Sequence, residues 1–226
     1  MSEKNIDTEF ALWAKTTPGQ RSFLVEVLHW FHYRTPALKQ SWGREEVLTW
    51  ELLRALELLP QSIFIRPLLI QLSGLTPKTN EVIAPLLSAE RLSVTYYPSL
   101  KLSGSKRNCR SDIGIGLLES PTIWIEAKTA RFKSEDLRSQ LDQQKQALER
   151  IFPDTPTLLA TLLPDSKALH DVPNISWDSV CAILKSGIGN LCEFGLEDDI
   201  THGYTLIARE LIDRIQSHPN RHAGWV

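Results

Sequence analysis

The hydrophobic pattern changes its period near Leu92, and this change limits the fold more than any other feature of the chain. Before it, apolar residues recur every three to four positions, most clearly from Gly43 to Leu59, where Pro60 ends the run. After it, the segments LSVTYY, DIGIGLL and TIWIEAK are strand-like, with basic and turn-rich connections between them. The pattern therefore predicts a β-meander that follows a set of helices.

The rest of the chain predicts more helices and one buried strand. Residues 7–15, 20–33, 61–73 and 80–90 have helical or mixed patterns, with breaks expected at Pro67, Pro77 and Pro85. Further helices are expected from Ser134, from Ser176 to near Gly187, and from Glu197 to Ser217, with both serines as N-caps. The apolar run TPTLLATLL suits a buried strand. Together these elements predict an α/β sandwich with a mixed sheet.

Length and composition favour one main domain. A chain of 226 residues with 42% hydrophobic and 23% charged residues can bury one sizeable core. We predict a helical cap over residues 1–40, an α/β domain over 41–217 and a loose tail over 218–226.

Charge and hydropathy limit the partners. The formal net charge is -2 and the pI is about 6.3, so any contact with nucleic acid must come from local basic patches. No apolar run reaches the roughly 18 residues of a membrane helix, and no signal-peptide pattern follows Met1. Three widely spaced cysteines suit reduced thiols. We expect a cytoplasmic protein with no membrane partner.

Two acidic residues and a lysine occupy the ends of the predicted strands. Strand alternation puts Trp124, Glu126 and Lys128 on one face of TIWIEAK. A turn at 119–121 lets DIGIGLL pair antiparallel with it, and counting outward from Ser120 brings Asp112 opposite Lys128 and next to Glu126. Cross-strand neighbours lie about 4.5–5.5 Å apart at Cβ, so we expect these charged groups to converge.

Such a convergence is suited to a divalent cation. Two close carboxylates repel each other unless a cation lies between them, and Mg²⁺ prefers a few carboxylate oxygens together with water and phosphate oxygens. Lys128 is then placed to orient or deprotonate a metal-polarised water, or to stabilise charge on a phosphate.

Asp112, Glu126 and Lys128 resemble the site of the PD-(D/E)xK nuclease superfamily, although Ser111 stands where that pattern has proline. The resemblance covers roughly residues 43–190. It implies a restriction-endonuclease-like αβα sandwich with a central mixed sheet, and a metal-dependent endonuclease or exonuclease that hydrolyses DNA phosphodiester bonds. It also implies Mg²⁺ as cofactor, with Mn²⁺ as a substitute, and leaves a homodimer open.

A third acidic residue is expected from the helix that begins near Gly43. With about 100° per residue, Glu45 projects into the apolar stripe that contains Leu52 and Leu56. A carboxylate in that position is costly unless a shared metal site compensates, although the start of a helix also favours an acidic residue. The resemblance favours Glu45 as a metal ligand and catalytic residue, with Glu51 second.

In many of these nucleases the helix after the lysine contributes a glutamine. Gln140 is the expected residue, because Gln140, Gln144 and Leu148 share one row of that helix and Leu137 and Leu141 indicate its sheet-facing side. The tyrosine that accompanies such a glutamine in recombination-type exonucleases is missing. Solvated glutamines on a polar helix face are the alternative interpretation.

Basic residues cluster on both sides of the predicted strands. They could contact phosphates, or they could simply belong to solvated loops. The expected nucleic-acid-binding residues are Lys101, Lys106, Arg107, Arg110, Arg131 and Lys133.

Two other interpretations remain beside the nuclease. The chain could be a non-catalytic nuclease-like domain that binds nucleic acid or protein. Alternatively, Glu126 and Lys128 could form only a structural ion pair, and side chains of Asp112 and Glu126 that point apart would support this.

Overall fold

The computed structural model describes residues 44–73, 77–96, 98–100, 109–117, 120–129, 132–164, 169, 171–191, 193 and 197–217. The expected helices at 7–15 and 20–33, the cap over 1–40 and the tail over 218–226 lie outside these ranges. The described helices are α3 (Arg44–Leu58), α4 (Gln61–Ser73), α5 (Pro77–Ser88), α6 (Ser134–Ile151), α7 (Trp177–Leu191) and α8 (Asp198–Gln216). None of them is long and apolar enough to cross a membrane.

The strands form a mixed sheet, which confirms the predicted α/β class. They are β1 (Ser93–Tyr96), β2 (Ser99–Leu100), β3 (Cys109–Arg110), β4 (Ile113–Leu117), β5 (Ser120–Ala127), β6 (Leu158–Leu163) and β7 (Asn174–Ser176). The five-stranded sheet has the order β1-β4-β5-β6-β7, with antiparallel pairs up to β5 and parallel pairs beyond it. The short strands β2 and β3 pair separately. These two strands and β7 were not predicted.

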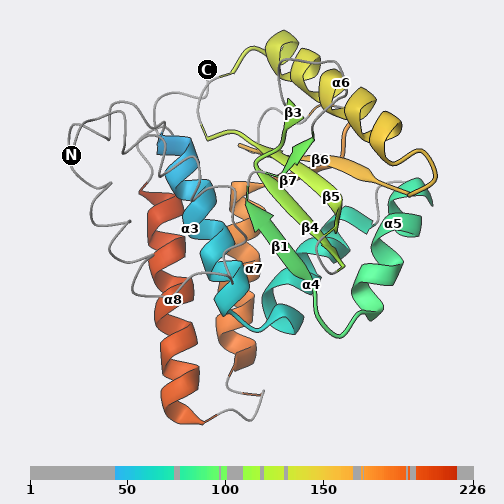
Figure 1. The fold of residues 1–226 in the computed structure, drawn as a ribbon. Helices are drawn as coiled ribbons and strands as arrows, with labels where there is room; N and C mark the ends of the chain where they lie inside the picture. The colour runs from blue at the N-terminus through green and yellow to red at the C-terminus, as the bar shows by residue number, and fades with distance from the viewer. Residues whose placement is uncertain are drawn as a thin grey trace, which may run out of the picture.

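Helices cover both faces of the five-stranded sheet (Figure 1). Helix α6 lies over one face, whereas α3, α4 and α7 lie on the other, and α8 packs against α3 and α7. Alternation along β5 explains this arrangement. Ile123, Ile125 and Ala127 join the larger core under α3, α4 and α7, whereas Trp124 packs with Leu148 of α6.

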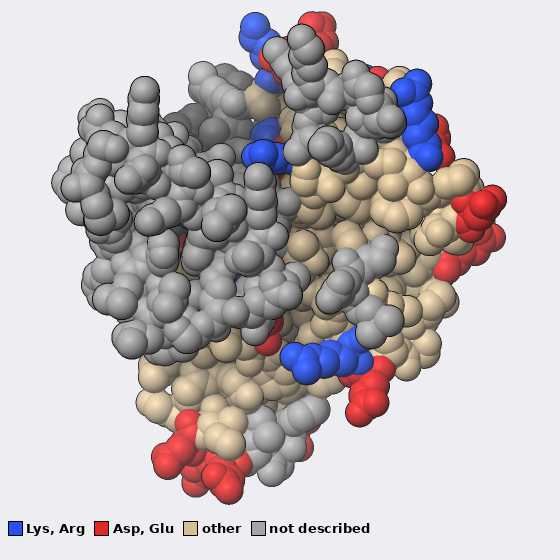
Figure 2. Space-filling model, viewed as in Figure 1, with Lys and Arg blue, Asp and Glu red and all other residues tan. Residues whose placement is uncertain are grey.

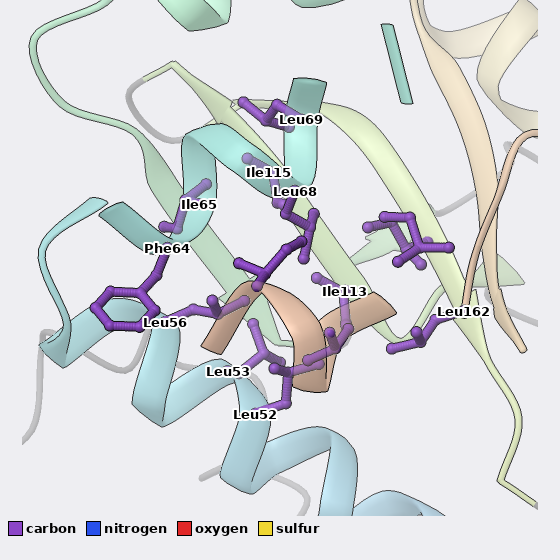
Figure 3. Close-up of a cluster of buried hydrophobic side chains, with 14 of the residues drawn as sticks. Leu52, Leu53, Leu56, Phe64, Ile65, Leu68, Leu69, Ile113, Ile115 and Leu162 are labelled. Atoms are coloured by element: carbon purple, nitrogen blue, oxygen red, sulfur yellow. The ribbon is translucent and has the colours of Figure 1, made fainter. Parts of the chain in front are cut away.

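The larger core joins α3 and α4 to the sheet (Figure 3). Leu52, Leu53 and Leu56 of α3 meet Phe64 and neighbouring residues of α4, and both groups face strand residues from β4 and β6. The apolar stripe predicted for α3 is buried throughout, at Leu48, Leu52, Ala55, Leu56 and Leu59. Burial of this stripe provides the platform on which the central strands lie.

Two of the three breaks expected at prolines were wrong, because Pro67 lies inside α4 and Pro85 inside α5. The break expected at Pro77 is confirmed, since α4 ends at Ser73 and Pro77 begins α5. A proline inside a helix removes one backbone hydrogen bond, so packing must hold the helix together. In α4 the flanking Phe64 and Leu68 are buried in the core, and this burial offsets the loss.

Two helix boundaries also differ from the prediction. Lys133, rather than Ser134, is the N-cap of α6, and no side chain caps that end. The predicted cap of α7 is confirmed, because Ser176 Oγ accepts a hydrogen bond of 2.9 Å from the backbone N–H of Ser179. However, α7 continues past Gly187 to Leu191. Gly187 therefore does not end the helix, and it lies against the ring of Phe64.

This close contact predicts opposite effects at two glycines of α7. A Cβ at Gly187 would lie 2.8 Å from Phe64 Cζ, whereas a Cβ at Gly189 would meet nothing within 4 Å. We expect Gly187→Ala to lower the free energy of unfolding by about 1–3 kcal/mol through overpacking. Gly189→Ala should raise it by about 0.5–1 kcal/mol, because alanine favours the helix. Urea denaturation measures both, and equal stability of the two variants would contradict the packing described.

Candidate functional site

The strand register brings Asp112 to Glu126. Ile113 pairs with Ile125, so Asp112, the residue before β4, comes opposite Glu126. The predicted pairing of Asp112 with Lys128 was therefore two residues out of register. The expected proximity of Asp112 to Glu126 nevertheless holds.

The turn explains the difference in register. The predicted register counts pairs outward from Ser120 as the centre of the turn. In the structure Ser120 is instead the first residue of β5, and it pairs with Leu117. The register then shifts between Ile115 and Gly116, and Thr122 is left as the extra residue of β5. A bulge of this kind moves every later pair by one position.

Asp112 is attached to the end of β5 by its backbone and its side chain. Its N–H donates to Ile125 O at 3.1 Å. Its carboxylate oxygen Oδ2 accepts a hydrogen bond of 2.7 Å from the N–H of Ala127. Ala127 lies between Glu126 and Lys128, so Asp112 is held beside both residues of the predicted site.

Glu126 is a buried carboxylate with three hydrogen-bond donors. Its side chain is 2% exposed. Oε1 accepts hydrogen bonds from Lys128 Nζ at 2.7 Å and from Gln140 Nε2 at 2.6 Å. Oε2 accepts one from Gln144 Nε2 at 2.8 Å. The structure thus brings three polar side chains to one carboxylate, and the predicted Lys128 and Gln140 are among them.

Gln144 is the site residue that the sequence reasoning missed. It is 2% exposed, and its amide also donates to the carbonyl oxygen of Arg110 at 2.6 Å. A signal was present, because Gln144 follows Leu141 by three residues and precedes Leu148 by four, which places it on the buried side of α6.

Lys128 is fixed through its backbone. Its N–H donates to Leu162 O at 2.9 Å, and its carbonyl oxygen accepts a hydrogen bond of 2.9 Å from the indole Nε1 of Trp177. Its side chain is 20% exposed and is bonded to Glu126. The Lys128 side chain is therefore partly exposed, while its ammonium group is bonded to a buried carboxylate.

A second polar pair continues the site across the sheet. Thr161 is adjacent to Glu126 in the parallel register of β5 and β6, and it is fully buried. Thr161 Oγ1 lies 3.0 Å from the side-chain amide of Asn174, its neighbour in β7. The α6-facing side of the sheet thus carries polar groups on three adjacent strands, of which only Glu126 was predicted.

Several other predicted residues are not placed at this site. Glu45 is the second residue of α3, but its side chain lies outside the described part of the chain, as do Lys101, Lys106, Arg107 and Arg131. Glu51 pairs with Arg214 of α8 at 3.4 Å. Arg110 and Lys133 are described, and both are exposed.

Charges of both signs lie around α6. Figure 2 shows basic side chains close to acidic ones along this helix. Exposed residues of α6 include Arg138 and Lys145 as well as Asp142 and Glu149. Contacts to a polyanion must therefore come from a few local cations such as Arg110 and Lys133.

The described residues fit a divalent cation with two protein carboxylates. They contain no group of three or more His, Cys, Asp or Glu that could hold a metal. Mg²⁺ commonly uses one or two carboxylates and keeps several waters, so Asp112 and Glu126 can suffice. Gln144 Oε1 supports this fit, because it is buried and accepts no hydrogen bond from the described part of the chain, so it can accept one from a water ligand.

The charge of Glu126 also affects Cys109, and this can be measured. Burial and, second, the Glu126 carboxylate raise the pKa of the Cys109 thiol. The thiolate is the reactive form of cysteine. The rate of alkylation of Cys109 by iodoacetamide should therefore rise at a higher pH than the rate for a free cysteine does. Glu126→Gln removes the negative charge and should lower the midpoint of this pH profile, followed by mass spectrometry of the Cys109 peptide.

The matched control removes a charge from the exposed start of α6. Glu135→Gln should leave the midpoint unchanged, because Glu135 is exposed to solvent. A midpoint that is the same in Glu126→Gln and in the unmodified chain would contradict the placement of Cys109 beside this carboxylate.

Comparisons with protein-family models, with curated proteins and with solved structures found no match to this chain. The candidate site is therefore defined by the geometry of Asp112, Glu126, Lys128 and the two glutamines of α6. Any function assigned to it must follow from that geometry and from the resemblance carried by these residues.

Proposed function

We propose that the chain is a Mg²⁺-dependent nuclease that hydrolyses DNA phosphodiester bonds, on a fold of the restriction-endonuclease-like type. The observation that carries the proposal is the attachment of the Asp112 carboxylate to the end of β5, where Glu126 and Lys128 form an ion pair. Asp112 is bonded to Ala127, and Lys128 is bonded to Glu126. These are the three residues whose pattern resembles the PD-(D/E)xK superfamily.

Asp112 and Glu126 would hold the cation, and Mn²⁺ could replace Mg²⁺. When bound, the cation supplies Lewis acidity towards a phosphate oxygen and towards a water molecule. From the described residues, Glu126 accepts one hydrogen bond at Oε2 and two at Oε1, and a carboxylate oxygen can accept two. Oε2 therefore keeps acceptor capacity for the cation while Oε1 stays bonded to its donors.

Lys128 would act on the water or on the phosphate. Its side chain is partly exposed, and its backbone is fixed by Leu162 and Trp177. A fixed cation there can stabilise the negative charge that develops on the phosphate, and an amine can also orient the attacking water. Gln140 would hold Glu126 in place through its hydrogen bond to Oε1.

The basic residues would contact the DNA backbone. Arg110 and Lys133 are exposed and precede Asp112 and α6, respectively. Their contacts, together with those of Lys101, Lys106, Arg107 and Arg131, would offset the unfavourable net charge of the chain.

Cleavage of DNA tests the proposal directly. We expect the purified protein to cleave DNA in Mg²⁺ or Mn²⁺ and to be inactive in EDTA. Asp112→Asn, Glu126→Gln and Lys128→Met should each lower the rate by at least about 100-fold, the usual scale for a lost catalytic group.

The matched controls are exposed residues of α6. Asp142→Asn and Lys145→Met make the same chemical changes away from the site and should keep the wild-type rate. Cleavage that survives in both Glu126→Gln and Lys128→Met would rule out the proposed site.

A second candidate function is a non-catalytic domain that binds nucleic acid. The observation that favours it is the burial of Glu126, whose three donors already satisfy it without a cation. This hypothesis predicts that DNA is retarded in gel electrophoresis by the protein in EDTA, and that calorimetry detects no uptake of Mn²⁺. Uptake of Mn²⁺ that Glu126→Gln abolishes would exclude it in favour of the nuclease.

A further inference from the structure

Gln144 differs from the other glutamines of α6 in its burial. Gln143 and Gln146 are exposed, whereas Gln144 is 2% exposed and lies between the helix and the sheet. A buried amide costs free energy unless its polar atoms are paired, and an apolar side chain would fill the same position without this cost. The packing of α6 alone therefore gives no reason for a glutamine here.

The amide nitrogen of Gln144 joins two separate sheets. It donates to Arg110 O of β3 at 2.6 Å and to Glu126 Oε2 of β5 at 2.8 Å. Arg110 lies two residues before Asp112 in the chain. The Gln144 side chain thus holds the Glu126 carboxylate by a direct hydrogen bond. It also holds the segment that leads to Asp112, by a hydrogen bond to the backbone of Arg110.

The amide oxygen of Gln144 takes no part in these two hydrogen bonds. Gln144 Oε1 is buried and has no hydrogen-bond partner among the residues that the structure describes. A buried acceptor left unpaired is unfavourable, because it has lost its hydrogen bonds to water. A hydrated divalent cation at Glu126 carries water molecules, which donate hydrogen bonds, so the cation would bring the missing donor to this atom.

We infer that Gln144 is a positioning residue that sets the separation of the Asp112 and Glu126 carboxylates and accepts a hydrogen bond from a water of the bound cation. Its main effect is on metal affinity, and it does not touch the DNA. This inference rests on the proposed function, because it concerns the same metal site. It adds a residue that the pattern of Asp112, Glu126 and Lys128 does not contain.

The test compares glutamines on one helix. Gln144→Leu removes the amide and keeps an apolar volume, whereas Gln143→Leu and Gln146→Leu make the same change at exposed positions. We expect calorimetry to show Mn²⁺ affinity lowered about 10–100-fold in Gln144→Leu, the range for residues that orient metal ligands. The two controls should bind Mn²⁺ with wild-type affinity.

A second readout separates positioning from contact with the substrate. If Gln144 acts on metal affinity, raising the Mg²⁺ concentration should restore DNA cleavage by Gln144→Leu towards the wild-type rate. Thermal unfolding shows that the variant is folded. Should the branched leucine prevent folding, Gln144→Met supplies an unbranched apolar side chain for the same measurements.

The outcomes distinguish this inference from the nuclease proposal. Wild-type Mn²⁺ affinity in a folded Gln144→Leu or Gln144→Met variant would overturn the role of Gln144 and leave the nuclease proposal intact. A wild-type protein that binds Mn²⁺ but does not cleave DNA would contradict the nuclease, while lowered affinity in Gln144→Leu would still support positioning. A wild-type protein that takes up no Mn²⁺ overturns both.

Discussion

The burial of the Glu126 carboxylate is the constraint on which the site and its covering helix depend. A charged group that is 2% exposed is tolerated only with strong pairing, and Lys128, Gln140 and Gln144 supply it. Two of these donors come from successive turns of α6. The helix must therefore lie over the sheet with this polar row inward, and apolar residues such as Leu141 and Leu148 complete the same face.

The rest of the fold holds this carboxylate rigidly. On the opposite face of β5, Ile125 and Ala127 are embedded in the core beneath α3, α4 and α7, so the strand cannot rotate its polar side away from α6. Trp177, at the start of α7, bonds to the carbonyl oxygen of Lys128 and links that helix to the end of the strand. A site held by packed elements on both sides is preorganised, which suits the binding of a cation or a charged transition state.

The sequence allowed the broad fold to be predicted because periodicity is a local property. The strand alternation was sufficient to place Glu126 and Lys128 on one face, and the helical row was sufficient to choose Gln140. The pairing of Asp112 was misjudged because Ser120, the expected centre of the turn, already belongs to β5 and pairs with Leu117. The bulge at Thr122 then corrects one of the three positions of this error, which leaves two. Gln144 was missed because its spacing from Leu141 and Leu148 indicates the buried side of α6 but does not identify the groups it would bond there. Pro67 was misread because burial of its neighbours outweighs its local preference.

The central claim is that Asp112 and Glu126 together bind a divalent cation. Crystals soaked in Mn²⁺ and measured at the manganese absorption edge test it most directly. Anomalous density is expected in contact with both carboxylates, with a coordinated water within hydrogen-bond distance of Gln144 Oε1. Mn²⁺ density confined to other surface carboxylates, with the Lys128–Glu126 pair unchanged and no ion beside Asp112, would contradict it.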